Sequence, residues 1–326
     1  MSISRTPQTS RPLRIGTRAS ALALWQARHV ESLIRALPAP PPVELVPIAT
    51  TGDLRVDVPL WAVRGRAFFT KEIDRALLED RIDVAVHSLK DLPTAMEPGV
   101  ALVAVLKRED PRDALLSRTG VPLSELPPGA RIGTSSLRRR AFLTRARRDL
   151  QLLELRGNVP TRLERLEQGD YDAIVLAAAG LKRLGLEHRI TQHLSPEEFP
   201  PAVSQGAIGV CTRADDEISY GWLKPLDDLP TRLATTAERA LLERVEGGCQ
   251  VPLGALATAA HQDIHLHAAV CALDGSRLLQ ASGSAQATRP AAAAALGVRL
   301  AVELIANGAA DLIAAERAAQ DHVEAP

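Results

Sequence analysis

Residues 14–17 read Arg-Ile-Gly-Thr, and residues 131–134 repeat the same four letters. Each copy ends a short apolar stretch, passes through small polar residues and enters a helix-like segment. We predict these helices over residues 21–37 and 137–148 from their apolar spacing. A strand that turns through Gly-Thr into a helix is typical of an α/β unit.

A second matched pair follows in the same order. Residues 83–86 read Asp-Val-Ala-Val, and residues 172–175 read Asp-Ala-Ile-Val. Each strand candidate follows a predicted helix, over 71–80 and 161–168, and a capping box that begins at Thr161 opens the second one. Two matched pairs in one order predict two related α/β units.

The Gly-Thr turns offer a place for an anion, because the start of a helix carries unpaired N–H groups and a partial positive charge. Two such turns facing each other would form a cleft between two lobes. The alternative is that the small polar residues only cap their helices. Arginines stand beside these caps in both copies, which capping does not explain; the residues concerned are Thr17, Arg18, Thr134, Ser135, Ser136, Arg138 and Arg139.

Charge is distributed unevenly along a chain that is neutral overall. The 326 residues hold 39 Lys and Arg and 39 Asp and Glu, whereas residues 131–165 hold ten Arg and three acids, a local charge of +7. A neutral total and only nine aromatic residues argue against a nucleic-acid platform. The length favours two or three domains, and no apolar run reaches the length of a membrane helix.

The C-terminal part predicts a smaller α+β domain with an antiparallel sheet. A capping box at Thr235 and Glu238 predicts a helix that runs to about residue 246. Alternating apolar residues over 264–271 predict a half-buried strand, and Asp274-Gly275 is typical of a hairpin turn. Pro290 opens a long Ala-rich helix that ends at Asn307-Gly308.

Lys90 and Asp91 follow the buried strand that begins at Val84. Ligands of open α/β sheets bind beyond the carboxyl ends of the strands, so these two residues could meet a carboxylate and a cation or N–H group. The alternative is a surface ion pair in the turn before Pro93.

The arginine cluster suits carboxylates or phosphates, because a guanidinium is a rigid fork that binds them bidentately. Arg138 and Arg139 lie at a helix start, and Arg156 and Arg162 flank the turn at Gly157-Asn158. A nucleic-acid patch or a solvated helix face remains an alternative, and we expect part of the run between residues 138 and 148 to be plain surface.

Three cysteines are too few and too irregular for a disulfide framework or a zinc pattern. Cys249 lies on a Gly-rich loop after a helix end, whereas Cys211 and Cys271 have the surroundings of small core residues. We interpret the histidines at 261, 265 and 267 as solvent-side residues and expect no metal site. Residues 1–11 carry Arg and Ser but no acid and are interpreted as a frayed terminus, which leaves the cytoplasm as the expected compartment.

Five stretches together resemble the porphobilinogen deaminase (hydroxymethylbilane synthase) family across nearly the whole chain. They are RIGTRASALALWQ at 14–26, VHSLKDLP at 86–93, GTSSLRR at 133–139, LRGNVPTRL at 155–163 and GGCQVP at 247–252. The resemblance implies two similar lobes with mixed sheets, like those of periplasmic binding proteins, and a small C-terminal domain. Its implied boundaries are 13–106 with 207–224, 112–200 and 229–326, after a frayed segment 1–12.

The resemblance also implies an activity and a site. The family links four porphobilinogen units head to tail, releases an ammonia from each, and yields the linear tetrapyrrole hydroxymethylbilane. A dipyrromethane cofactor, held through a thioether to Cys249, primes the chain, and Asp91 stabilises the positive charge formed when ammonia leaves. The residues implied to hold the cofactor are Lys90, Thr134, Ser136, Arg138, Arg139 and Arg162; those implied to hold the substrate are Arg18, Ser20, Arg156, Asn158, Arg183 and Gln205. We expect a cytoplasmic monomer without nucleic-acid or membrane partners.

Two positions depart from the family pattern. Residues 66–69 read Arg-Ala-Phe-Phe where the family has Lys-Gly-Leu-Phe, and Cys211 stands where the family usually has Glu. Two classes of protein remain as rivals on the residues alone. One is a two-lobed anion sensor without catalysis, and the other is a nucleic-acid-binding protein that uses the arginine run.

Overall fold

The first copy of the Arg-Ile-Gly-Thr stretch lies in an inner strand of the first sheet. The computed structural model describes residues 11–50, 70–245 and 251–323. In the first lobe the sheet order is β2-β1-β3-β10-β4; β1, β2 and β3 run parallel, and β10 runs antiparallel to both of its neighbours. These strands are β1 (Leu13–Arg18), β2 (Val43–Ile48), β3 (Val84–Ser88), β4 (Val100–Val105) and β10 (Ile208–Arg213).

The second lobe repeats this sheet strand for strand. Its order is β7-β6-β8-β5-β9, with β6 parallel to β7 and β8, and β5 antiparallel to β8 and β9. The strands are β5 (Asp113–Ser117), β6 (Arg131–Gly133), β7 (Gln151–Leu153), β8 (Ala173–Ala177) and β9 (Gln192–His193). The prediction of two related α/β units with mixed sheets is therefore confirmed.

The recurring Arg and Asp have the same structural task in both lobes. Arg14 donates its backbone N–H and its side-chain Nε to Asp83 Oδ2, at 2.9 and 3.0 Å. Arg131 does the same to Asp172 Oδ2, at 2.9 and 3.2 Å. Each pair joins the amino-terminal ends of two parallel strands, at the end of the sheet opposite the Gly-Thr turns. These matched letters are therefore structural.

Helices cover the sheets and begin close to the predicted positions. They are α1 (Ala21–Arg35), α3 (Lys71–Leu78), α4 (Leu137–Ala146), α5 (Val159–Glu167), α6 (Ala178–Arg183) and α7 (Glu217–Leu223), with a 3₁₀ turn over Leu89–Asp91. One predicted helix start was wrong. Helix α5 begins at Val159, not Thr161, because the Asn158 side chain accepts from the Thr161 N–H at 3.0 Å and so caps the helix.

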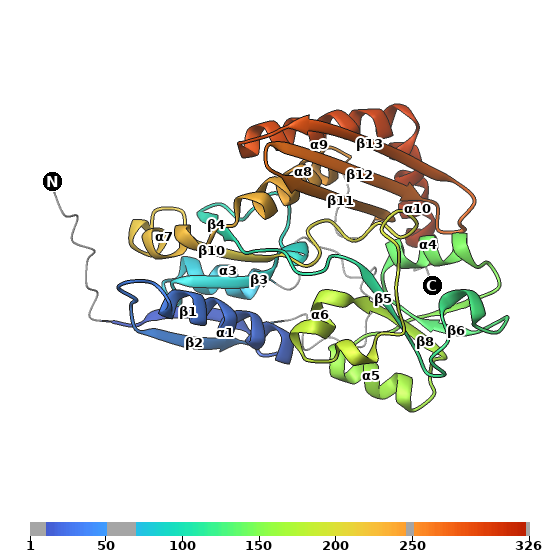
Figure 1. Ribbon diagram of the computed structural model, residues 1–326, viewed down its shortest axis with the longest axis horizontal. Helices are drawn as coiled ribbons and strands as arrows, with labels where there is room; N and C mark the ends of the chain where they lie inside the picture. Colours follow the sequence, from blue (N-terminus) through green and yellow to red (C-terminus); the bar gives the residue numbers. More distant parts are fainter. Residues whose placement is uncertain (1–10, 51–69, 246–250, 324–326) are drawn as a thin grey trace.

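The C-terminal unit packs two long helices against a three-stranded antiparallel sheet, in the order β11-β12-β13. Figure 1 shows it in orange and red above the two lobes. Its elements are α8 (Leu229–Arg244), β11 (Leu253–Ala260), β12 (Asp263–Cys271), β13 (Leu278–Gln286), α9 (Pro290–Ala306) and α10 (Ala309–Val323). The strand, the hairpin at Gly275 and the Ala-rich helix are confirmed.

The predicted capping box of this unit was wrong. Helix α8 begins six residues before Thr235, because the Asp228 side chain accepts from the Thr231 N–H and caps the helix there. Glu238 lies in mid-helix, fully buried, and accepts from Arg108 at 2.6 Å. A Thr-x-x-Glu pattern at a helix start and one used for tertiary contacts look alike in sequence.

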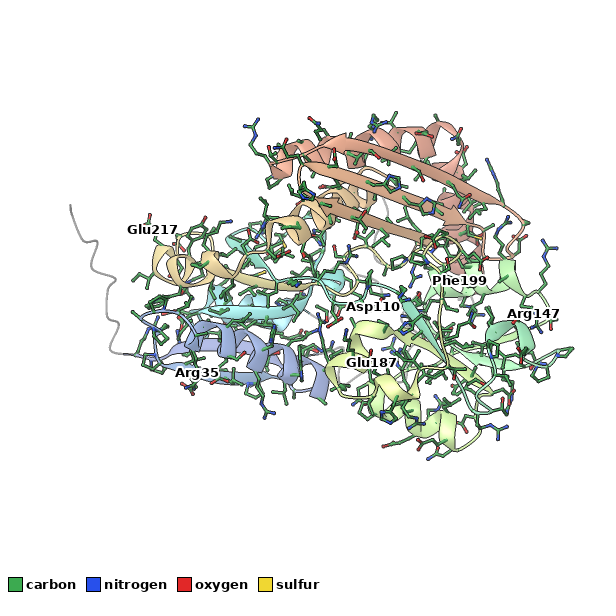
Figure 2. The ribbon with its side chains drawn as sticks, in the orientation of Figure 1. Arg35, Asp110, Arg147, Glu187, Phe199 and Glu217 are labelled. Carbon is green, nitrogen blue, oxygen red and sulfur yellow. The ribbon has the colours of Figure 1, made fainter. Side chains whose placement is uncertain are left out.

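Two crossovers, residues 106–112 and 194–207, join the lobes. Gly206 accepts from the Glu109 N–H at 3.1 Å, so the two crossovers touch. Gly206 has φ +90, and a Cβ there would collide with the Glu109 carbonyl oxygen, so only glycine fits. Asp110, labelled in Figure 2, lies on the first crossover between the lobes. The site described below is built around these crossovers.

Within the described ranges no single helix is long and apolar enough to cross a membrane. Helices α9 and α10 meet that test only as a pair, by length and composition, and they are bent by 74° where they meet.

Candidate active site

A small pocket of about 100 Å³ lies at the carboxyl ends of β1 and β3, where an open α/β sheet binds its ligands. Both Gly-Thr-bearing strands of the chain end on this side of their sheets. The first helix turn, the end of β3 and the predicted pair Lys90 and Asp91 all contribute to its wall. The polar lining residues are Arg18, Ser20, Gln26, Thr70, His87, Ser88, Lys90 and Asp91.

Lys90 is partly buried, and its ammonium contacts the second crossover. Its Nζ donates to Gln205 Oε1 at 3.2 Å, on the second crossover. Burial lowers the Lys90 pKa to about 8; Asp91 and Asp113 oppose this effect, and Arg138 and Arg139 add to it. A lysine with this pKa stays mostly cationic at neutral pH but holds its proton weakly.

Arg138 and Arg139 start α4 and point inward onto one carboxylate. Arg138 Nη2 donates to Asp113 Oδ2 at 2.7 Å, and Arg139 Nη2 and Nε donate to Asp113 Oδ1 at 2.8 and 3.1 Å. The pair is only 4% and 7% exposed. Arg138 Nε is a buried donor with no hydrogen-bond partner among the described residues. A buried orphan donor on a guanidinium suits an anionic ligand.

Arg162 adds a further cation to this cluster. Its Nε donates to the Gly157 carbonyl at 2.7 Å, which draws the side chain back over the helix start. Burial lowers the Arg162 pKa to about 10; Arg139 and Arg156 lower it further, and Asp91 raises it. These mutual effects show that cations of the second lobe lie near Asp91 of the first lobe.

Caps occupy several predicted polar residues. Ser20 accepts from the Ala23 N–H and caps α1, and Ser136 accepts from the Arg139 N–H and caps α4. Thr134 is buried, and its hydroxyl accepts from the Ser136 N–H at 3.2 Å. The exposed Asn158 caps α5. Capping and ligand binding are compatible, because each helix start still has N–H groups that no helical bond uses.

Arg183 lies where the two lobes meet. Its Nη2 donates to the Gly206 carbonyl at 2.6 Å, and its guanidinium lies 5.7 Å from the centre of the Trp25 ring on α1. Burial lowers the Arg183 pKa to about 10, with partial compensation from Glu109. Arg183 therefore contacts both α1 of the first lobe and the second crossover.

Most predicted site residues therefore gather along the cleft, but two predicted features cannot be placed. Cys249 and the segment 66–69 lie outside the described residues. Sequence reasoning missed Asp113, the carboxylate that holds both arginines. An acid before an apolar run also occurs at Asp83 and Asp172, but those two lie at the far end of their sheets. Only the antiparallel direction of β5 brings Asp113 to the cleft.

The histidines of the last sheet form strand contacts. His265 and His267 each pair through Nδ1 with a serine of β13, Ser284 and Ser282, at 3.0 and 2.7 Å. In residues 11–50, 70–245 and 251–323 no group of three or more His, Cys, Asp and Glu side chains is arranged to hold a metal ion.

Two mixed-sheet lobes, joined by two crossovers and carrying buried arginines near the carboxyl ends of their parallel strands, define a two-lobed α/β protein. Residues 13–220 match the family model "Porphobilinogen deaminase, dipyromethane cofactor binding domain", and residues 232–306 match "Porphobilinogen deaminase, C-terminal domain". The chain belongs to the porphobilinogen deaminase family. It is a transferase of tetrapyrrole synthesis that uses a dipyrromethane cofactor.

Solved structures of bacterial proteins resemble this chain at low sequence identity. A VFT2 domain of BvgS from Bordetella pertussis is 11% identical, with 65% of this chain and 84% of that chain covered and a TM-score of 0.38. A YaeC-family lipoprotein from Enterococcus faecalis is 12% identical, with 67% and 91% covered and a TM-score of 0.40. A putative sulfonate-binding protein SsuA from Methylobacillus flagellatus is 17% identical, with 72% and 68% covered and a TM-score of 0.38.

Proposed function

We propose that this chain is a hydroxymethylbilane synthase whose reaction takes place between Asp91 and the arginines of α4. Four porphobilinogen molecules are joined head to tail. In each step the C–N bond of the aminomethyl group breaks and ammonia leaves. A C–C bond then forms to the free α-carbon of the last ring, which loses its proton. After the fourth addition, water cleaves the C–C bond that joins the tetrapyrrole to the primer, and its oxygen becomes that of the hydroxymethyl group.

One observation carries the proposal. Among the described residues, the four cations Lys90, Arg138, Arg139 and Arg162 lie near two carboxylates, Asp91 and Asp113, at the carboxyl ends of the strands. These cations outnumber the carboxylates; Arg138 and Arg139 are buried and Lys90 and Arg162 are partly buried, and charge removed from water is costly unless it is paired. Each pyrrole of the substrate carries an acetate and a propionate, so a growing chain supplies the missing negative charge.

The dipyrromethane cofactor fits these donors. The orphan Nε of Arg138, the remaining N–H groups of Arg139 and the ammonium of Lys90 can each meet a carboxylate oxygen. When bound, the cofactor supplies the free pyrrole α-carbon onto which the first substrate is added. We assign Thr134, Ser136 and Arg162 to the same task.

Asp91 stabilises the positive charge that forms during the reaction. Loss of ammonia leaves a cationic methylene-pyrrole, and a carboxylate beside the pyrrole N–H groups stabilises that cation in a site with little water. The same carboxylate can take up the α-proton that the coupling releases. The carboxylates of the incoming substrate are held by Arg18, Ser20, Arg156, Asn158 and Arg183. Gln205 contributes indirectly, because both N–H groups of its amide already donate to Asp113 and the Pro111 carbonyl.

We also propose attachment of the cofactor through a thioether to Cys249, three domains with the boundaries 13–106 with 207–224, 112–200 and 229–326, and a cytoplasmic monomer that binds neither nucleic acid nor membrane. The three separate sheets support this division. Cys211 and Cys271 are buried, and burial raises the pKa of both thiols, which fits packing roles.

Intact-mass spectrometry tests the proposal. Purified wild type should carry an adduct of two pyrrole units, and addition of porphobilinogen should extend it by further units. Cys249→Ala should lack the adduct, whereas the matched control Cys271→Ala should keep it. An unmodified wild type that neither extends an adduct nor releases ammonia from porphobilinogen would rule the function out.

A further inference from the structure

The carboxylate of Asp113 lies in the cleft but takes no part in the reaction. It is fully buried, and its two oxygens accept four hydrogen bonds, from Arg138, Arg139 and Gln205. A carboxylate at this position would repel the carboxylates of the pyrroles, so it does not bind the substrate. Its partners are the groups assigned to ligand binding above.

Asp113 is also connected to the other lobe. Gln205 Nε2 donates to Asp113 Oδ1 at 2.9 Å and to the Pro111 carbonyl at 2.8 Å, which fixes the orientation of the amide. The opposite end of that amide, Oε1, accepts from Lys90 Nζ at 3.2 Å. One buried charge therefore connects a first-lobe cation with two second-lobe cations through the crossover.

The connection has an electrostatic reason. Arg138 and Arg139 are neighbours in sequence and both are buried, so each raises the cost of the other's charge. Burial lowers the pKa of Arg138, Arg139 lowers it further, and Asp113 opposes both effects. Burial alone would raise the pKa of Asp113, but the two guanidinium groups outweigh it and hold that pKa well below its usual range. Asp113 is thus ionised throughout the physiological pH range.

We propose that Asp113 is a positioning residue that orients Arg138 and Arg139 directly, and Lys90 through Gln205, for the carboxylates of the dipyrromethane cofactor. This inference rests on the proposed function. In this arrangement the unused N–H groups of the two guanidinium groups are already oriented before the ligand binds. A preorganised site does not have to order two long side chains at the moment of binding.

Asp113→Asn keeps the shape of the side chain and removes its charge. We expect cofactor assembly, followed as adduct mass against time after apoprotein is mixed with porphobilinogen, to slow by about 10- to 100-fold, as the loss of a hydrogen bond to a charged group does. The matched control is Asp83→Asn, which removes a buried carboxylate that holds Arg14 at the far end of β3. It should lose stability but assemble the adduct at the wild-type rate.

A second readout separates positioning from simple structural support. The ammonium of Lys90 must be protonated to hold a carboxylate, and the charged groups that act on it are Asp91, Asp113, Arg138 and Arg139. Removing the Asp113 charge lowers the Lys90 pKa further, so the alkaline limit of adduct formation should move to lower pH in Asp113→Asn. It should stay in place in Asp83→Asn.

Two results would overturn the inference: an Asp113→Asn protein that assembles the adduct at the wild-type rate, or one that assembles slowly with an unmoved alkaline limit. If Asp113→Asn does not fold, Asp113→Glu keeps the charge but displaces it by one methylene. Asp113→Glu should then assemble the adduct slowly while its melting temperature stays near that of wild type. Adduct assembly by Asp113→Glu at the wild-type rate would refute the role. Wild type without any adduct would refute the proposed function instead.

Discussion

Glu238 connects three parts of the molecule through one carboxylate. From mid-α8 it accepts from Arg108 on the first crossover at 2.6 and 3.2 Å, and from the backbone N–H groups of Ser204 and Ala257 at 2.6 and 2.7 Å. The side chain has no solvent exposure. Glu238→Gln keeps the shape but leaves the Arg108 cation without a buried counter-charge. The perturbation therefore acts on the C-terminal unit and both crossovers together.

The expected cost follows from this geometry. Removing one partner of a buried ion pair costs about 3–5 kcal/mol, because the other charge stays buried and unpaired. For a 326-residue chain that unfolds cooperatively, this corresponds to a fall of about 4–7 °C in melting temperature. Differential scanning calorimetry of the wild type and the variant measures it.

The control is Glu243→Gln, an exposed glutamate one and a half turns further along α8, which should change stability by less than about 0.5 kcal/mol. Arg108→Met combined with Glu238→Gln should cost less than the two single changes together, because the double variant leaves no unpaired charge. A Glu238→Gln protein that melts within about 1 °C of wild type would refute the reasoning, since a change that small would mean that the Arg108 charge costs nothing when it is left unpaired.

Three further predictions concern the cleft and the crossovers. Asp91→Asn should keep the wild-type melting temperature and lose about 100-fold or more of kcat for ammonia release; near wild-type turnover would remove the electrostatic role. Burial raises the pKa of Asp74 to about 6, while the neighbouring His87, 3.9 Å away, is neutral because burial lowers its pKa to about 4. The Asp74 contribution to stability is therefore full below about pH 4 and lost as the pH rises through about 6, so Asp74→Asn should stabilise the protein at pH 7 by about 1–3 kcal/mol. Melting curves of wild type and Asp74→Asn at about pH 4 and at pH 7 check this. An equal change in melting temperature at both pH values would contradict it. Gly206→Ala should cost about 1–3 kcal/mol, since a Cβ would strain the left-handed backbone and meet the Glu109 carbonyl, and chemical denaturation that finds no loss would show that the crossovers part easily.

Local patterns predicted the strands and most helices well. The repeated Arg-Ile-Gly-Thr and the paired Asp-led strands placed β1, β6, β3 and β8 in equivalent positions of two sheets. They succeed because apolar stretches that end in Gly-Thr and small polar residues have one favourable local structure, a buried strand that turns into a capped helix.

Helix starts were predicted less well where side chains competed for the same role. Thr161 and Thr235 each stood in a capping-box pattern, but Asn158 and Asp228 cap those helices. Both capping residues, an asparagine and an aspartate, lie upstream of the threonine that the pattern indicated. Each of the two helices has a proline in its first turn. A cap is decided by which side chain reaches the N–H groups, and the sequence alone does not reveal that distance.

The sequence by itself determined the kinds of groups in the cleft: an Arg-rich segment, a Lys-Asp pair after a buried strand, and serines that begin helices. These are properties of neighbouring residues. Only the tertiary structure decided which charges meet, since Lys90, Asp113, Arg138 and Gln205 come from four separate segments. The decisive step is the antiparallel direction of β5, which turns an acid that looks like Asp83 or Asp172 toward the cleft. Strand direction depends on how distant segments pair, and no local pattern encodes it.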